Sequence, residues 1–67
     1  MTLQINGEQC ELADGLLLSA LIEQMGMKPD RVAVERNGDI VPRARWTETM
    51  LLEGDRLEIV HFVGGGR

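Results

Sequence analysis

The sequence contains few of the residues from which catalytic and metal sites are usually built. It has one cysteine, Cys10, and one histidine, His61. A single cysteine excludes an intramolecular disulfide and a cysteine-rich zinc site, and it fits a reducing compartment such as the cytoplasm. No nucleophile–base pair, metal-ligand cluster or Walker-type loop can be recognised along the chain. We therefore expect a chain that is not an enzyme and that binds neither a metal nor a cofactor.

Long apolar segments are also missing. No stretch approaches the roughly 18 apolar residues that a membrane span requires, and no basic segment leads into an apolar run at the N-terminus. The formal net charge is −4, which disfavours contact with nucleic-acid phosphates. With 67 residues, we expect one cytoplasmic domain with a thin core that docks on other proteins, and neither on membranes nor on nucleic acid.

Two Asn-Gly pairs stand between regions in which apolar and polar residues alternate. Residues 2–13 alternate on both sides of Asn6-Gly7. This dipeptide accepts the positive φ angles of a tight type I′ turn, so a hairpin is expected there. A third strand is expected at 31–35, just before the second pair, Asn37-Gly38.

Five apolar residues at helical spacing predict one helix at about 17–25. Gly26 stands where the left-handed residue after a helix is expected, and Pro29 prevents continuation. At the other end, Asp14 and Ser19 compete as the N-cap. The apolar face consists of Leu17, Leu18, Leu21, Ile22 and Met25.

The remainder of the sequence predicts short elements and one long strand. Ile40-Val41 has the pattern of an edge strand that Pro42 stops, and residues 43–46 that of a tight turn or a single helical turn. A further short strand is expected at 50–52. The last strand, 56–62, carries apolar residues on both faces, which is typical of a central strand.

This order of elements predicts an α+β fold of the β-grasp type, with a mixed four- or five-stranded sheet packed on one helix. We expect the β-grasp domain at 1–62 and a flexible C-terminal tail at 63–67. The tail contains Gly64, Gly65 and Gly66 in succession. Glycine has no side chain to bury, so packing does not explain them. Composition alone leaves open a frayed terminus or a tail that threads into a narrow slot of a partner.

Short motifs run from one end of the chain to the other. They are Asn6-Gly7-Glu8, Leu21-Ile22, residues 32–37, residues 40–43, Trp46, Gly54-Asp55 and residues 58–66. Each alone is a common turn or strand. In this order and at this length they resemble the ThiS family, the ubiquitin-like β-grasp sulfur carriers of bacterial thiamin (thiazole) biosynthesis.

The resemblance implies that chemistry occurs at the last glycine. In the family, an adenylating (E1-like) enzyme uses ATP and magnesium to convert the glycine carboxylate into an acyl-adenylate. Sulfur that a cysteine desulfurase provides then displaces AMP and leaves a thiocarboxylate, from which thiazole synthase takes the sulfur. Carried over to this sequence, Gly66 holds the thiocarboxylate, and Val63, Gly64 and Gly65 thread into the partner.

Arg67 departs from the family pattern, because the family ends at glycine. With Arg67 in place, Gly66 has no free carboxylate. Either a protease removes Arg67, or Arg67 is a remnant of expression, or this copy is inactive. Exposed termini are readily cut, so we expect Gly66 to react after the loss of Arg67.

Four other residues admit a structural and a functional interpretation. His61 and Phe62 stand beside the tail and are expected to belong to a partner-docking surface. Cys10 alternates with Leu12, which predicts a small apolar residue on the inward face and not a nucleophile. Trp46 is expected to cover one edge of the core and not to anchor a partner.

Two other functions remain open from the sequence. The small subunit of molybdopterin synthase shares the fold, the Gly-Gly end and the adenylation chemistry, although this chain is short for that family. A ubiquitin-like interaction module with an inert tail would bind a protein without any reaction at Gly66.

Overall fold

The computed structural model describes residues 1–62, and the predicted tail at 63–67 lies outside the described residues. Within 1–62 the chain forms five strands, one α-helix and two short 3-10 helices, in the strand and α-helix order β-β-α-β-β-β. The mixed sheet packed on one helix that the sequence predicts is confirmed. The elements are β1 (Thr2–Ile5), β2 (Glu8–Glu11), α1 (Leu18–Gln24), η1 (Pro29–Arg31), β3 (Val32–Arg36), β4 (Asp39–Ile40), η2 (Arg43–Glu48) and β5 (Arg56–His61).

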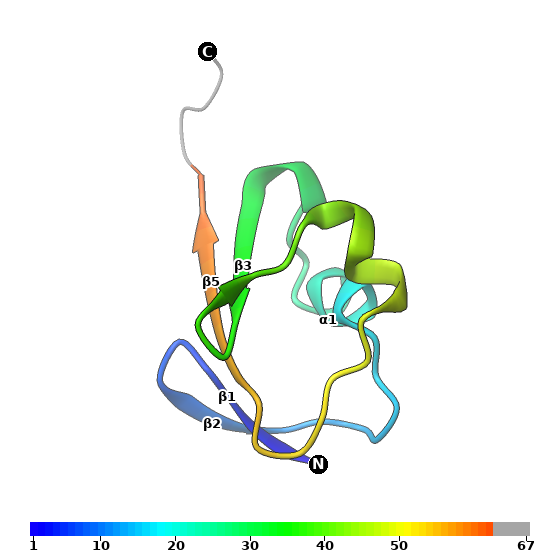
Figure 1. The fold of residues 1–67 in the computed structure, drawn as a ribbon, viewed down its shortest axis with the longest axis vertical. Coiled ribbons are helices and arrows are strands. Elements are labelled where there is room, and N and C mark those ends of the chain that lie inside the picture. The colour runs from blue at the N-terminus through cyan, green and yellow to red at the C-terminus, as the bar shows by residue number, and fades with distance from the viewer. Residues whose placement is uncertain (63–67) are drawn as a thin grey trace.

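The five strands form one mixed sheet in the order β2-β1-β5-β3-β4. The first and last strands, β1 and β5, lie side by side and run parallel, whereas the other neighbours are antiparallel. β5 is therefore the middle strand, as its apolar residues on both faces predict. It runs away from the end of the molecule at which the N-terminus lies (Figure 1).

The core lies between one face of this sheet and the helices. α1 and η2 lie on the same side of the sheet, and the opposite face is open to solvent (Figure 1). No helix within residues 1–62 has the length and hydropathy needed to cross a membrane. The buried apolar residues are Leu3, Ile5, Leu18, Leu21, Ile22, Val32, Val34, Trp46, Leu51, Leu57 and Ile59.

Both Asn-Gly pairs form the turns expected of them. The φ angles are 53° and 83° at Asn6 and Gly7, and 53° and 91° at Asn37 and Gly38. Positive φ at both central residues is the condition for a type I′ turn, whose twist matches that of the flanking strands. The first turn joins β1 to β2 and the second joins β3 to β4.

The helix is confirmed, with two corrections at its ends. Neither Asp14 nor Ser19 is the N-cap: Leu17 occupies that position without a side-chain hydrogen bond. The backbone of the following residue is satisfied by tertiary structure, because Leu18 N–H donates to the Thr49 carbonyl at 2.8 Å.

Met25 was placed on the buried face, and this is wrong. It is the C-cap of α1 and is 39 % exposed, because the chain leaves the helix there and Gly26 turns it at φ 73°. Met27 packs against the core instead. Its N–H donates to the Ile22 carbonyl at 3.1 Å, which brings the chain back over the last turn.

The predicted strand at 50–52 is also wrong. Met50 forms an isolated bridge with Leu17, and Leu51 N–H donates to the Leu16 carbonyl at 3.0 Å. This segment pairs with the extended residues that lead into α1 and not with the sheet, because Leu51 must enter the core, where it is 1 % exposed. The fourth strand is the short edge strand β4, which the Ile40-Val41 pattern predicted to within one residue.

Candidate functional site

The site begins where β5 ends. His61 is the last residue of the strand, and Phe62 follows with its N–H donated to the Arg31 carbonyl at 2.7 Å. The segment that leads into β3 therefore remains paired with β5 up to Phe62. The residues predicted to react or to thread into a partner, Val63, Gly64, Gly65, Gly66 and Arg67, lie outside the described residues.

Asn6 extends the pairing of β5 beyond the end of β1. Its N–H donates to the Leu57 carbonyl at 2.9 Å. Its side-chain oxygen Oδ1 accepts from Ile59 N–H at 2.7 Å, and Nδ2 donates to the Ile59 carbonyl at 3.3 Å. The amide side chain therefore supplies the donor and the acceptor that a further strand residue would have supplied. β1 can turn at Asn6 while β5 continues straight.

Asn37 makes a similar connection on the other side of β5. Its N–H donates to the Arg56 carbonyl at 2.7 Å, and its Oδ1 accepts from Arg56 N–H at 2.9 Å. Its Nδ2 donates to the carboxylate of Asp55 at 3.1 Å. The two hairpin turns thus bind β5 from both sides through asparagine side chains.

Asp55 joins the start of β5 to the rest of the molecule. Asp55 is 5 % exposed, and its carboxylate also accepts from Arg36 Nε at 2.9 Å and from Leu52 N–H at 2.9 Å. Burial alone would raise the pKa of this carboxyl. The hydrogen bonds from Leu52, Asn37 and Arg36 outweigh burial and hold the pKa below its ordinary value of 3.8.

The asparagine and aspartate contacts were not predicted from the sequence, which assigned Asn6, Asn37 and Asp55 to turns alone. One signal was present: the same dipeptide, Asn-Gly, ends the two strands that turn out to flank β5. Asparagine offers both a donor and an acceptor to a neighbouring backbone. Which strand lies beside each turn depends on the order of the strands in the sheet, and the dipeptide does not specify that order.

The end of β5 is exposed on both of its faces. On the helix side, His61 lines an open hollow of about 460 Å³ with Gly26, Met27, Lys28 and Arg31. On the solvent side, Val60 is 57 % exposed, and Phe62 is 47 % exposed. His61 and Phe62 are thus accessible, as the predicted docking surface requires. Their contact with a partner stays a prediction.

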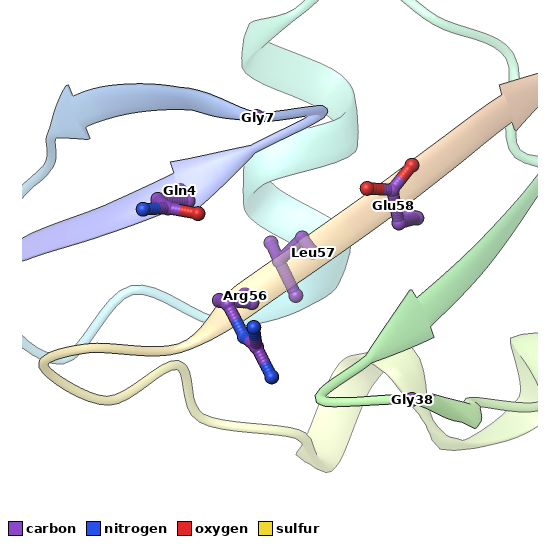
Figure 2. A pocket seen from close by; sticks show the side chains of 6 residues that line it. All are labelled: Gln4, Gly7, Gly38, Arg56, Leu57 and Glu58. Atoms are coloured by element: carbon purple, nitrogen blue, oxygen red, sulfur yellow. The ribbon is translucent and has the colours of Figure 1, made fainter.

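A second hollow lies at the opposite end of β5 (Figure 2). It measures about 180 Å³ and is lined by Gln4, Gly7, Gly38, Arg56, Leu57 and Glu58. Arg56 stands five residues before His61, so along a strand the two are about 17 Å apart. This hollow therefore lies nearer the start of β5 than His61 and Phe62 do. Residues 1–62 contain no group of three His, Cys, Asp or Glu side chains arranged to hold a metal ion.

Trp46 and Cys10 have the structural roles expected of them. Trp46 is 2 % exposed and donates its indole N–H to the Val41 carbonyl at 2.9 Å, so it covers an edge of the core and offers no surface to a partner. Cys10 is partly buried and packs against the core.

Comparison with known proteins gives a consistent result. The model of the ThiS family matches residues 3–66. The sulfur carrier protein ThiS of Bacillus subtilis is 38 % identical over 96 % of this chain and 98 % of its own length. The crystal structure of the thiamine biosynthesis protein ThiS from Geobacter metallireducens superposes with a TM-score of 0.84 at 30 % identity, covering 98 % of this chain and all of that one.

A longer relative is a thiazole synthase of Paramagnetospirillum magneticum. It is 42 % identical over 98 % of this chain, but this chain spans only 20 % of its length. A segment similar to almost all of this chain is therefore part of a polypeptide about five times longer.

Proposed function

The chain belongs to the ThiS family, and on that premise we propose that it is a sulfur carrier protein of thiamin biosynthesis whose reactive group is the Gly66 carboxylate. The observation that carries the proposal is the end-to-end match with the family, which runs from residue 3 to the last glycine and stops before Arg67. The chain itself supplies no catalysis in this proposal. It carries an atom between enzymes.

The proposed chemistry solves a problem of reactivity. A carboxylate is a poor electrophile because its negative charge repels nucleophiles. An adenylating enzyme with ATP and magnesium converts the Gly66 carboxylate into an acyl-adenylate and releases pyrophosphate. Persulfide sulfur, which a cysteine desulfurase draws from cysteine, attacks the acyl carbon, and AMP leaves. After reduction of the resulting acyl disulfide by a thiol, Gly66 ends in a thiocarboxylate.

Arg67 must be absent for this reaction. While the peptide bond between Gly66 and Arg67 is intact, the carbonyl carbon of Gly66 belongs to an amide and cannot be adenylated as a carboxylate. We propose that the active form ends at Gly66.

The geometry of β5 supports a carrier role. β5 is the central strand, and Asn6 and Asn37 bind its backbone from the two flanking turns. In this proposal, residues 1–62 are the folded domain, and residues 63–67 are the segment that enters the partner enzymes. Four residues span at most about 14 Å, so an enzyme that holds Gly66 must come close to His61 and Phe62. These two residues are therefore proposed as part of the docking surface, with Val63, Gly64 and Gly65 entering the partner.

The proposed partners follow from this chemistry. The thiazole synthase relative contains a segment similar to this chain, which supports thiazole synthase as the acceptor of the sulfur. It favours the thiamin pathway over a molybdopterin one. The adenylating enzyme and the desulfurase are proposed from the chemistry of activation. The cytoplasmic location stays a prediction.

Reconstitution tests the proposal. The chain ending at Gly66 is incubated with the adenylating enzyme, MgATP, a cysteine desulfurase, cysteine and a thiol reductant, and its intact mass is measured. We expect the mass increase for exchange of one oxygen for sulfur, and no change in the matched chain that retains Arg67. A chain ending at Gly66 that forms neither adenylate nor thiocarboxylate would contradict the proposal and leave an interaction module with an inert tail.

A further inference from the structure

The two Asn-Gly turns beside β5 also carry the side-chain amides of this chain that are most prone to hydrolysis. The chain has two asparagines, Asn6 and Asn37, and a glycine follows each of them. Asparagine is a thermolabile residue. Its amide is lost most readily before glycine, because glycine has no side chain to shield its own backbone nitrogen. Both turns are therefore chemically able to deamidate.

The reaction is intramolecular and consumes only water. The backbone nitrogen of the glycine attacks Cγ of the asparagine, a C–N bond forms, and the bond from Cγ to Nδ2 breaks with release of ammonia. Water then opens the resulting succinimide ring at one of its two carbonyl carbons. The product is aspartate, or isoaspartate when the main-chain carbonyl is the one that is released. No electrons are transferred, and a neutral amide becomes a carboxylate.

Both turns are open to water. Gly7 and Gly38 line the hollow of about 180 Å³ near the start of β5, and they lie on opposite sides of that strand (Figure 2). Apart from its chain neighbours, no atom of residues 1–62 lies within 4 Å of the place that a Cβ would take at either glycine. Access of water therefore does not limit the reaction.

The hydrogen bonds of the two amides to β5 oppose the reaction. Asn37 Oδ1 accepts from Arg56 N–H at 2.9 Å, and its Nδ2 donates to Asp55 at 3.1 Å. Asn6 Oδ1 and Nδ2 bind the backbone N–H and carbonyl of Ile59 at 2.7 and 3.3 Å. Ring closure changes the geometry at Cγ and releases Nδ2, so both bonds of an amide must break. The reaction is then confined to molecules in which this part of the fold has opened.

The two products differ in what the new oxygen meets. At Asn37 the oxygen that replaces Nδ2 faces the Asp55 carboxylate across a contact of 3.1 Å. Asp55 is 5 % exposed, and two carboxylates this close repel each other when both are ionised. At Asn6 the new oxygen faces the Ile59 carbonyl across 3.3 Å, while the other oxygen still accepts from Ile59 N–H. A charged acceptor strengthens that remaining bond.

We propose that Asn6 and Asn37 are sites of spontaneous deamidation that the folded chain suppresses, and that conversion of Asn37 destabilises the start of β5 whereas conversion of Asn6 is tolerated. The same dipeptide has two outcomes because only Asn37 donates to a carboxylate. Conversion of Asn37 is damage that limits how long a molecule stays folded. The proposal does not depend on the chemistry at Gly66.

Peptide mass spectrometry of the full chain tests the suppression. The protein is kept at neutral pH with and without denaturing urea, and conversion of each asparagine to aspartate or isoaspartate is followed over weeks. A synthetic peptide of residues 34–41 in the same buffer gives the rate of the unprotected sequence without urea. We expect Asn6 and Asn37 to react at least about tenfold more slowly in the folded protein. Equal rates in the folded protein, the denatured protein and the peptide would overturn the proposal.

Variants that imitate the products test the consequence. Urea denaturation should show the folding equilibrium constant lowered about tenfold or more by Asn37→Asp, and less than about threefold by the matched control Asn6→Asp. Combining Asn37→Asp with Asp55→Asn exchanges donor and acceptor across one contact. The double variant should therefore be about tenfold more stable than the two single losses predict together.

Three results would overturn the proposal. They are a larger loss for Asn6→Asp than for Asn37→Asp, single losses that simply add in the double variant, and a double variant that stays unfolded where Asn37→Asp alone does not fold. Recovery of the fold in the double variant would support the proposal even if Asn37→Asp alone is too unstable to measure.

Discussion

The two ends of β5 differ in how firmly they are held. At its start, backbone partners lie on both sides, and the buried Asp55 joins Arg36, Asn37 and Leu52. At its end, β3 and the residue before it provide the backbone partners on one side. Past Ile59 no pairing with β1 occurs within residues 1–62. Stability is therefore concentrated where β5 begins, and accessibility where β5 ends, next to the segment that is proposed to react.

Replacement of Asp55 should have the largest effect on stability. Asp55→Ala leaves the Arg36 guanidinium, the Asn37 amide and the Leu52 N–H without their common acceptor. We expect the free energy of unfolding to fall by about 3 kcal/mol, measured by urea denaturation. Asp55→Asn keeps the shape and one acceptor oxygen and should cost less. A loss below about 0.5 kcal/mol for Asp55→Ala would show that the start of β5 is not the firm end.

Replacement of Asn6 should have an intermediate effect. Asn6→Gly keeps the positive φ of the turn but removes the side chain that binds Ile59, so it isolates the contribution of that contact. We expect a loss of about 1–2 kcal/mol and faster hydrogen exchange of the Ile59 amide. If exchange of that amide is unchanged, Asn6 does not hold the second half of β5.

Acid should first destabilise the start of β5, where Asp55 lies. The folded-state pKa of Asp55 lies below its ordinary value of 3.8, so its ionised form stabilises the fold above that pH. Stability is then lost as the pH falls from the ordinary value through the lower folded-state pKa. Asp55→Asn should show a shallower decline of the free energy of unfolding over this range. Equal declines in the two proteins would assign the acid sensitivity to other carboxylates.

Substitutions at the exposed end should leave stability almost unchanged. His61→Ala and Phe62→Ser remove side chains that touch solvent, so we expect changes within about 0.5 kcal/mol. Thiocarboxylate formation by the adenylating enzyme should fall nevertheless, because these residues belong to the proposed docking surface. The measurement is the rate of the mass increase at sub-saturating carrier. A large loss of stability with full activity would show that the end of β5 stabilises the fold and does not serve in docking.

Local sequence signals sufficed for most of the fold. The Asn-Gly pairs predicted both turns, and the apolar residues on both faces of 56–62 predicted the central strand. The segment 50–52 was misassigned because a short run of apolar residues has the same pattern whether it joins the sheet or pairs with the approach to α1. Met25 was misassigned because helical spacing does not specify the residue at which a helix ends.

The candidate site, like the fold, could be predicted from the sequence only in part. The glycines and the resemblance to the family were sufficient to propose Gly66. The contacts of Asn6 with Ile59 bridge 53 residues of sequence, and the contact of Asn37 with Asp55 depends on which strand lies beside the turn. Neither can be inferred from a local pattern, because each requires the order and alignment of the strands.

The most direct test of the central claim is the mass of the C-terminal peptide of this protein after isolation from its native cells. We expect a peptide that ends at Gly66, part of it with one oxygen exchanged for sulfur. A peptide that ends at Arg67 in every molecule, without sulfur, would contradict the account.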